Sequence, residues 1–313
     1  MDTDAVDRTG DQDVERALAA LVDGDADAAR RAVAGGTSLL ASALREHLAG
    51  AGGGSVYDAP AAFAAFIRGG GNVRLYAAVS AALAGLYEAS RPARLLEVGC
   101  GDGAALVPAL RAVQHPPAHL DLVEPSAPLL DGVVRALRTE GIAGVPAGRS
   151  RLRVWSLTAQ AFVAELADAD PGEAWPLAQS TFALHTVPAA ERTDVLAALR
   201  PRVGVLALVE FDVPDAEVGS PEHVRFLART YEQGLAEYDE DRDLVAQGFL
   251  MPVLTGQLRP GAVRATYEQP AERWAEQVRE AGYTDVTTRV LDDYWSSPAF
   301  LLTARGTAEP QTA

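Results

Sequence analysis

The chain has 313 residues, of which 48% are hydrophobic, and its formal net charge is −16. This length and apolar content are enough for a sizeable core in one large domain with an appendage. The acidic balance disfavours nucleic acid and anionic membranes as partners, because both attract basic surfaces. No apolar run approaches the roughly 20 residues that span a bilayer, and the acidic N-terminus is unlike a signal peptide. We therefore expect a globular cytoplasmic protein.

Two features of residue usage exclude several kinds of catalysis. The sequence contains no lysine, so all 27 of its basic residues are arginine. This removes a Schiff-base lysine, a pyridoxal phosphate anchor and the lysine of a phosphate-binding loop. The single cysteine, Cys100, excludes an internal disulfide and a cysteine-based metal cluster. Usage rich in Ala and Arg and free of Lys also indicates a GC-rich bacterial genome.

The first 90 residues carry helical patterns alone. We expect residues 1–13 to be disordered and residues 14–90 to form an all-helical cap, in which apolar residues recur at helical spacing. Glycine clusters interrupt the cap, in AGAGGGS at 49–55 and in RGGGN at 68–72. Helices therefore end at these clusters.

From residue 91 to residue 305, short apolar strands alternate with helical patterns. The predicted strands cover residues 93–98, 118–124, 151–156, 177–184 and 203–211. The predicted helices between them cover residues 104–113, 129–140, 159–167 and 189–199. This alternation predicts an α/β fold with a Rossmann-like, doubly wound and mostly parallel sheet that has helices on both faces.

The alternation stops between residues 212 and 270. A helical stretch at 221–238 and a loop-rich stretch at 248–267 predict a lid inserted after the fifth strand. A helix at 271–281 then leads to two strands at 284–291 and 299–304, which are too close in sequence for a helical crossover. We therefore expect an antiparallel last strand, followed by a disordered tail at 306–313.

The stretch RLLEVGCGDGAAL, residues 94–106, joins the first strand to the first helix of this region. Glycines at such a turn let the backbone approach a ligand closely, and the helix start offers free N–H groups to a nucleotide. The residue pattern of this turn fits two kinds of cofactor. Gly99, Gly101 and Ala104 complete the dinucleotide pattern G-x-G-x-x-A. Glu97 and three glycines also complete E-x-G-x-G-x-G.

LEVGCGDG, residues 96–103, resembles motif I of the class I S-adenosylmethionine (SAM)-dependent methyltransferases. The resemblance implies that Glu97, Gly99, Gly101 and Gly103 form the turn under the methionine part of SAM. It also implies that Glu124, at the end of the second strand in LDLVEPS, binds the ribose hydroxyls. SAM is thus the expected cofactor and S-adenosylhomocysteine (SAH) the expected product.

The third-strand loop, SLTAQAF at 156–162, departs from the family, which usually has an acid there for the adenine amine. Thr158 and Gln160 are expected to supply the oxygen in its place, and Phe162 an apolar wall. The complete set expected to line the cofactor is Glu97, Gly99, Cys100, Gly101, Gly103, Glu124, Pro125, Thr158, Gln160, Phe162, Asn72 and Tyr76.

Three features favour SAM over a nicotinamide cofactor. Glu97 is charged where a dinucleotide-binding strand is ordinarily apolar, a helical cap precedes the first strand, and the closing strands resemble the antiparallel hairpin of the methyltransferases. An NAD-dependent oxidoreductase and a non-catalytic SAM-binding partner stay open as alternatives.

The only asparagine follows three glycines in FIRGGGNVRLY, residues 66–76. A glycine-rich turn that opens a helix can bind a carboxylate, so Gly71, Asn72 and Tyr76 could fold over the amino-acid end of SAM. The alternative is that Asn72 only caps its helix.

The methyl acceptor is expected beyond the carboxyl ends of the strands. His185 follows the fourth strand and could deprotonate a hydroxyl or an acidic carbon, although a structural histidine packed on the next helix is the competing interpretation. The other candidate catalytic residues are Glu210, at the end of the fifth strand, and Tyr231, in the insertion. The expected substrate-binding residues are Arg264, Tyr267, Phe226 and Tyr238.

We expect a methyltransferase that acts on a small molecule or short peptide in bacterial specialised metabolism. The atom that is methylated (O, N or C) stays open, as does a homodimer. One alternative is C-methylation of a 2-oxo acid assisted by a metal on His185, Asp212 and His223, since two histidines and a carboxylate suit a divalent cation. Apart from that set, no metal is expected.

Overall fold

The computed structural model describes residues 3–50, 60–142, 151–167, 173–261 and 266–308. The chain divides into two compact units. The helical unit comprises Met1–Arg74, Asp215–Ala265 and Tyr294–Ser297, and the sheet unit comprises Leu75–Pro214, Thr266–Asp293 and Pro298–Ala313. Across the described ranges, none of the helices combines the length and the apolar character needed to cross a membrane.

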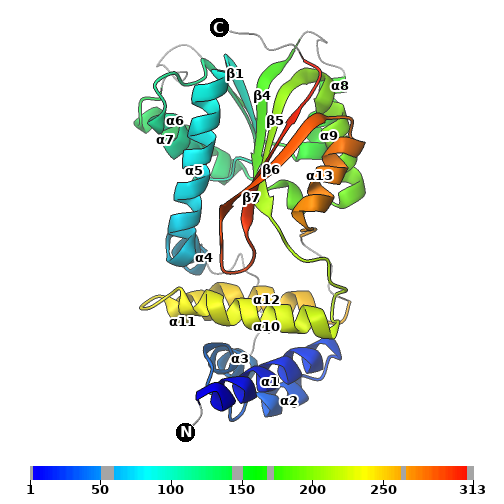
Figure 1. The fold of residues 1–313 in the computed structure, drawn as a ribbon. Helices are drawn as coiled ribbons and strands as arrows, with labels where there is room; N and C mark the ends of the chain where they lie inside the picture. The colour runs from blue at the N-terminus through cyan, green and yellow to red at the C-terminus, as the bar shows by residue number, and fades with distance from the viewer. Residues whose placement is uncertain (1–2, 51–59, 143–150, 168–172, 262–265, 309–313) are drawn as a thin grey trace. The chain divides into compact units, whose positions relative to one another are not determined.

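Seven strands form one sheet in the sheet unit (Figure 1). They are β1 (Arg94–Val98), β2 (His119–Val123), β3 (Leu152–Trp155), β4 (Trp175–Thr181), β5 (Val203–Phe211), β6 (Thr284–Asp292) and β7 (Ala299–Arg305). Their order is β3-β2-β1-β4-β5-β7-β6, and β1 to β5 pair in parallel. The last strand, β7, runs antiparallel to both β5 and β6. The prediction of a mostly parallel sheet with an antiparallel last strand is therefore confirmed.

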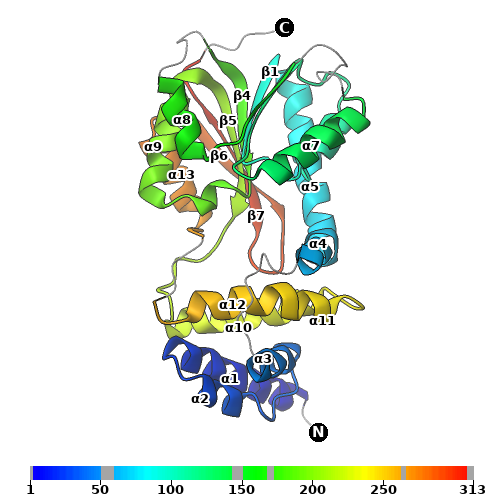
Figure 2. The ribbon, with the colours of Figure 1, turned by 180° about the vertical axis from the view of Figure 1, so that it is seen from behind.

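Helices cover both faces of this sheet (Figures 1 and 2). One face carries α5 (Gly70–Ser90), α6 (Leu106–Ala112) and α7 (Ala127–Thr139), and the other carries α8 (Ala159–Ala167), α9 (Ala189–Leu199) and α13 (Ala271–Glu280). Helix α7 buries Leu130, Val133 and Leu137, which share one helical stripe. The doubly wound arrangement follows from these stripes, because each must be covered by the sheet.

The helical unit combines the N-terminal helices with the segment inserted after β5. Its helices are α1 (Thr3–Val22), α2 (Ala26–Ala32), α3 (Leu39–Ala49), α4 (Pro60–Arg68), α10 (Pro221–Ala236), α11 (Arg242–Val245), the π-helical turn Ala246–Leu250 and α12 (Met251–Leu258). Leu18 and Leu44 share one apolar core with Leu227 and Leu254. The predicted cap and lid are therefore parts of one unit.

Hydrogen bonds at the start of α3 join the same two segments. The carboxylate of Glu232 in α10 accepts hydrogen bonds from the backbone N–H groups of Leu39 and Leu40, at 2.9 and 2.7 Å. These groups lie in the first turn of α3 and have no partner within their own helix. The inserted segment thus completes a helix of the N-terminal segment.

The chain ends are more ordered than the sequence indicated. Helix α1 begins at Thr3, within residues 1–13, where we expected disorder. Extending a helix beyond a packed segment costs little once the segment has formed. Near the other end, the N–H groups of Gly306, Thr307 and Ala308 donate to carbonyls of Gly204, Arg200 and Val203. The expected tail at 306–313 is thus held in place as far as residue 308, and residues 309–313 lie outside the described residues.

Two predicted boundaries inside the chain also differ. The stretch 248–267 was expected to be rich in loops, but α12 covers Met251–Leu258 because Met251, Leu254 and Leu258 form a buried stripe. Helix α5 was assigned to the cap, yet its residues from Leu75 onward belong to the sheet unit. Its fully buried residues recur every fourth position from Leu75 to Tyr87, which gives one long apolar face.

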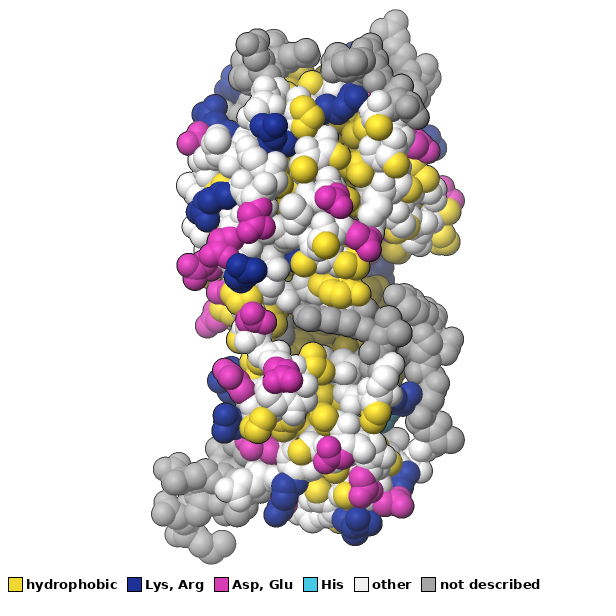
Figure 3. Space-filling model, turned by 90° about the vertical axis from the view of Figure 1, so that its right-hand side faces the viewer, with side chains coloured by type: hydrophobic (Ala, Val, Ile, Leu, Met, Phe, Trp, Pro, Cys, Tyr) yellow, Lys and Arg dark blue, Asp and Glu magenta, His cyan; other side chains and the backbone are white. Residues whose placement is uncertain are grey.

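Acidic and basic side chains are interspersed on the face of the molecule drawn in Figure 3. Several of the exposed ion pairs join residues three apart on one helix, such as Arg30 with Asp27 and Arg273 with Glu276. Pairs of this kind contribute little to stability, because water screens both charges.

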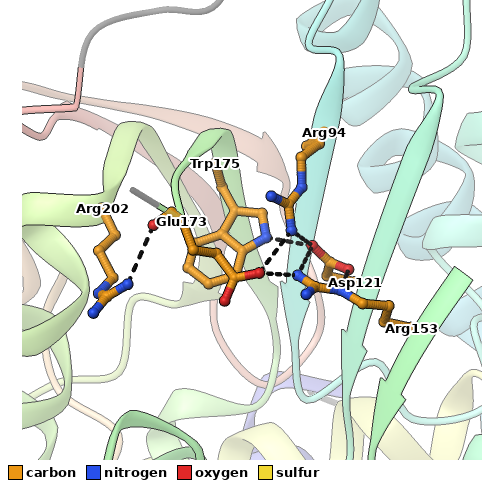
Figure 4. Close-up of polar contacts among 6 residues, drawn as sticks. All are labelled: Arg94, Asp121, Arg153, Glu173, Trp175 and Arg202. Carbon is orange, nitrogen blue, oxygen red and sulfur yellow. Dashed lines mark hydrogen bonds and ion pairs between the residues drawn. The ribbon is translucent and has the colours of Figure 1, made fainter. Parts of the chain in front are cut away.

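An ion-pair network around one buried carboxylate behaves differently and lies toward the amino end of the strands (Figure 4). The side chain of Asp121 in β2 is 1% exposed and accepts from Arg94 at 2.7 Å and from Arg153 at 2.8 and 3.0 Å. Trp175 Nε1 donates to the same carboxylate, and Glu173 pairs with both arginines. Burial alone would raise the pKa of Asp121, but these hydrogen bonds and charges hold it below its ordinary value. The network ties β1, β2, β3 and β4 together.

Candidate cofactor and acceptor site

The glycine turn lies between β1 and α6 and depends on left-handed backbone conformations. Gly99, Gly101 and Gly103 have φ angles of 78°, 52° and 81°, a region that other residues rarely adopt. A Cβ on Gly103 would lie 2.5 Å from Cγ2 of Val133, and a Cβ on Gly99 would overlap Cβ of Ala183. At Gly101, by contrast, no atom lies within 4 Å of the Cβ position. The turn is therefore packed at its two ends and open in the middle, where a ligand can approach.

Glu124 joins the end of β2 to the open part of this turn. One carboxylate oxygen accepts from the N–H of Gly101 at 3.0 Å, and the other accepts from the N–H of Ser126 at 2.9 Å. Glu124 is 7% exposed. Because a carboxylate offers about four acceptor positions, these two bonds leave acceptor capacity for a pair of vicinal hydroxyls.

Glu97 lies under the turn, at the fourth position of β1, and is 2% exposed. Gln179 donates from its side-chain amide to Glu97 and accepts from the hydroxyl of Tyr87 at 2.8 Å. Burial raises the pKa of Glu97 to about 8, against the opposing effect of the bond from Gln179. Its carboxyl is therefore mostly protonated at neutral pH.

His185 and Glu210 form a hydrogen-bonded pair at the carboxyl ends of β4 and β5. His185 lies in the 3₁₀ turn Leu184–Thr186, and its Nδ1 is 2.7 Å from Oε2 of Glu210. Its backbone N–H also donates to Oε1 of Glu210 at 3.2 Å. This arrangement directs Nδ1 to the carboxylate, so Nε2 is the nitrogen that could take a proton from a methyl acceptor. Residues 183 and 99 are in close approach, which places the histidine turn beside the glycine turn.

Neighbouring charged groups and burial act in opposite directions on the pKa of His185. Burial lowers the pKa of the imidazole, but the charge and hydrogen bond of Glu210 and the charge of Glu268 outweigh burial and the opposing charge of Arg192. The pKa of His185 is therefore raised above its ordinary value. The side chains of His185 and Glu210 are 14% and 1% exposed, so water screens this pair weakly.

Two aromatic residues at the same strand ends are not among the predicted site residues. Phe182 directly follows β4 and stacks on Phe211, the last residue of β5, with ring centroids 4.5 Å apart and planes 13° apart. Phe182 has a φ of 50°, which is costly for a bulky residue and typical of functional positions. The signal in the sequence was their place at strand ends. Tyr76, one of the predicted cofactor residues, meets Phe182 edge-on at 6.0 Å.

The predicted adenine contacts have other partners. The Thr158 hydroxyl accepts from the N–H of Ala161 at 3.2 Å and so caps α8, and Gln160 donates to Glu191 at 2.9 Å. The ring of Phe162 is 1% exposed and packs against Trp155 and Trp175, so its role as a cofactor wall stays a prediction. Phe162 is on the face of α8 that covers the sheet.

The two other predicted cofactor residues near the turn differ in exposure. Cys100 is buried, and burial raises the pKa of its thiol, which keeps the thiol neutral. Pro125 is exposed directly after Glu124, and its carbonyl accepts from the hydroxyl of Ser156 at 3.4 Å.

Asn72 belongs to a buried polar network in the helical unit. Its amide donates to the carbonyl of Phe66 at 2.8 Å and to the hydroxyl of Tyr238 at 3.4 Å, and it accepts from the hydroxyl of Tyr294 at 3.2 Å. Tyr238 also donates to the carbonyl of Phe66, at 3.0 Å. These bonds fasten the junction of α4 and α5. They go to a carbonyl and to two hydroxyls rather than to the backbone N–H groups of the helix start, so the helix cap and the contact with SAM both stay predictions.

The predicted acceptor residues are divided between the units. Tyr231 is 7% exposed in the helical core, where its ring meets Trp295 edge-on at 5.9 Å and its hydroxyl accepts from Gln257 at 3.3 Å. Phe226 packs against the same core. Tyr267 lies in the sheet unit, where its N–H donates to the carbonyl of His185 at 2.6 Å. Arg264 lies outside the described residues.

The three residues of the metal alternative each have a different partner. His185 pairs with Glu210, Asp212 accepts from the N–H of Ala271 at 2.7 Å at the start of α13, and His223 accepts through Nδ1 from the N–H of Gly219 at 3.1 Å. Within the part of the chain that the structure describes, no group of three or more His, Cys, Asp or Glu residues is arranged to hold a metal ion.

No protein-family model and no curated protein sequence matches the chain. Among solved structures, it is similar to an O-methyltransferase family protein from Burkholderia thailandensis, with 16% identity, 76% of this chain and 58% of that chain covered, and a TM-score of 0.49. Magnesium protoporphyrin IX methyltransferase from Synechocystis PCC 6803, with bound SAH, gives 14% identity, 75% and 84% coverage, and a TM-score of 0.46. PigF with SAH gives 14% identity, 74% and 56% coverage, and a TM-score of 0.46.

The chain thus spans little more than half the length of the Burkholderia protein and of PigF. At such identities the likeness concerns the fold alone, so the function has to be argued from the residues of this chain.

Proposed function

We propose that the protein is a SAM-dependent methyltransferase that acts on a small-molecule acceptor bearing an ionisable O–H or acidic C–H group. The observation that carries the proposal is that the glycine turn, open at Gly101 and bonded to Glu124, lies beside the His185–Glu210 pair within one unit. A glycine turn that is open at Gly101 and a candidate base therefore lie at the same edge of the sheet.

The residues of the turn suit SAM. The open Cβ position of Gly101 lets a ligand approach the backbone, and Glu124 keeps acceptor capacity for ribose hydroxyls. By the resemblance of LEVGCGDG to motif I, the methionine part would lie on the turn above Glu97. When bound, SAM supplies a methyl group on a sulfonium with a good leaving group.

The protein's share of the chemistry is alignment, exclusion of water and removal of a proton. Nε2 of His185 would take the proton of the acceptor, while Glu210 orients the ring and stabilises the imidazolium that forms. General-base catalysis of this kind contributes roughly 10²- to 10⁴-fold. The stacked rings of Phe182 and Phe211 lie at the same ends of β4 and β5 and would provide an apolar surface there.

Calorimetric titration with SAM, SAH, NAD⁺ and NADH tests the cofactor. We expect SAM and SAH to bind and both nicotinamide nucleotides to give no heat of binding. Glu124→Ala should weaken SAH binding, whereas Glu280→Ala, which removes an exposed carboxylate at the end of α13, serves as the control. Binding of NAD⁺ in place of SAH would support the oxidoreductase alternative and reject the proposal.

Methyl transfer is tested with methyl-labelled SAM and a panel of small molecules with acidic hydroxyl or carbon groups. We expect labelled product with the native chain, and loss of turnover with retained SAH binding in His185→Asn. SAH binding without turnover across a broad panel would favour the non-catalytic SAM-binding alternative.

A further inference from the structure

Arg192 is a buried charged residue to which the proposed chemistry gives no part. It lies in α9 with a relative exposure of 0%, and its guanidinium carbon is 3.9 Å from the ring centroid of Trp274. Burying a charge is costly unless specific groups compensate for the lost water. The partners of the guanidinium therefore indicate what it does.

These partners lie on three segments around His185. One terminal nitrogen of Arg192 donates to the carbonyl of Leu184 at 3.3 Å and to the carbonyl of Tyr267 at 3.1 Å. Nε donates to the side-chain carbonyl of Gln277 in α13 at 2.8 Å. Leu184 precedes His185 in its turn, and Tyr267 donates its N–H to the His185 carbonyl. Arg192 thus bonds the residue before His185 and the residue that binds the His185 backbone.

We propose that Arg192 is a positioning residue that holds the turn Leu184–Thr186 so that the imidazole of His185 stays on Glu210. Only the use of His185 as a base rests on the proposed function. A planar guanidinium suits the task, because its donors are fixed in direction and can bond several backbone carbonyls at once. A lysine or an apolar side chain lacks this geometry.

Positioning and simple electrostatics predict opposite effects on His185. The charged groups that face it are Glu210 on β5, Glu268 before α13 and Arg192 on α9. The charge of Arg192 lowers the pKa of His185, so removal of this charge alone would raise that pKa. Release of the turn would instead weaken the contact with Glu210, and burial would then lower the pKa of His185.

The experiment is an NMR titration of His185 in the full-length native chain, Arg192→Met and Arg192→Lys, with His185→Asn used to assign the signal. We expect the pKa of His185 to fall by about one pH unit or more in Arg192→Met. Arg192→Lys keeps the charge and three donors, and we expect it to restore part of the loss. If Arg192→Met does not fold, Arg192→Lys decides, since a native pKa in that variant would overturn the proposal.

Arg202→Met is the matched control. Arg202 also bonds two backbone carbonyls, those of Leu166 at 2.7 Å and Glu173 at 3.4 Å, and Figure 4 draws its contact with Glu173. It directly precedes β5, and Glu210 lies at the other end of that strand. We expect this variant to lower the unfolding midpoint and leave the His185 titration unchanged. A rise in the pKa of His185 in Arg192→Met would reject positioning in favour of electrostatics. A lower midpoint with an unchanged pKa would show that Arg192 is merely structural.

The titration needs neither SAM nor an acceptor. Failure of the native chain to bind SAH would overturn the proposed function and leave the result for Arg192 standing. An unchanged His185 titration in a chain that binds SAH would overturn the positioning role alone.

Discussion

Gly101→Ala and Gly103→Ala add the same methyl group at two positions of one turn, and we expect them to affect different properties. Both glycines have positive φ, at 52° and 81°. A Cβ at residue 101 meets nothing within 4 Å, whereas at residue 103 it lies 2.5 Å from Val133 Cγ2 and 2.9 Å from Val107 Cγ2. The two variants therefore separate the effect of an added methyl group on stability from its effect on ligand affinity.

The expected magnitudes follow from these contacts. An alanine in the left-handed region costs about 1–2 kcal/mol, and reduced freedom of the unfolded chain offsets about 0.4–1 kcal/mol of it. Gly101→Ala should thus lose about 1 kcal/mol of stability. Gly103→Ala carries the same cost plus about 1–3 kcal/mol for overpacking against the two valines. For SAH, the order reverses, because the new methyl of Gly101→Ala occupies the space that the ligand would approach.

Urea unfolding followed by tryptophan fluorescence measures the first property, and calorimetric titration with SAH measures the second. We expect at least about a tenfold weaker SAH affinity in Gly101→Ala, equivalent to about 1.4 kcal/mol, and near-native affinity in the folded fraction of Gly103→Ala. Native SAH affinity in Gly101→Ala would refute the assignment of the turn as the cofactor site.

Three further predictions concern buried ionisable groups. The pKa of Glu97 is raised to about 8 in the fold, so the unfolded chain loses this proton at a lower pH than the folded chain does. The free energy of unfolding should therefore fall between about pH 4.5 and 8, by up to about 1.4 kcal/mol per pH unit. Urea unfolding of Glu97→Gln at pH 6 and 8.5 should lack this loss, and the same pH dependence in the variant and the native chain would contradict the prediction. The pKa of Asp121 is lowered, so its contribution is present above its unfolded pKa and is lost as pH falls through its folded pKa. Asp121→Asn should therefore cost about 1.5–3 kcal/mol at pH 7, as expected for lost hydrogen bonds to a charged group, and less near pH 2, and an equal cost at both pH values would count against it. Glu210→Gln should lower the pKa of His185 below its ordinary value, because burial then acts without the opposing carboxylate; an unchanged NMR titration would show that the pair does not set this pKa.

Local patterns predicted most of the sheet unit. The strand at 203–211 and the helices at 159–167 and 189–199 have the bounds that the sequence predicted, because a continuous apolar run and a helical stripe are each visible within a short window. The glycine turn was predictable for the same reason, since three glycines at alternate positions after a strand indicate a tight turn. His185 and Glu210 could be expected near each other because parallel strands end at one edge.

Features that depend on contacts between distant segments were not predictable in this way. The apolar faces of α1 and α10 can each be recognised in the sequence, but the sequence does not show that these two faces cover each other. The stacking of Phe182 on Phe211 requires the register of β4 and β5, and the burial of Phe162 requires the rotation of α8. Each fact depends on tertiary packing, which a periodic pattern constrains but does not specify.

The helical unit is built from separate segments of the chain, and this determines when it can form during synthesis. Its three segments, Met1–Arg74, Asp215–Ala265 and Tyr294–Ser297, are separated by the strands β1 to β5 and by β6. Domains fold as their residues emerge from the ribosome, at about 5–20 residues per second. The N-terminal helices, although made first, must therefore wait with their apolar faces uncovered until α10 and α12 have been synthesised. Nascent chains stopped before residue 215 should bind hydrophobic-surface chaperones through these helices, whereas chains that include residue 297 should release them.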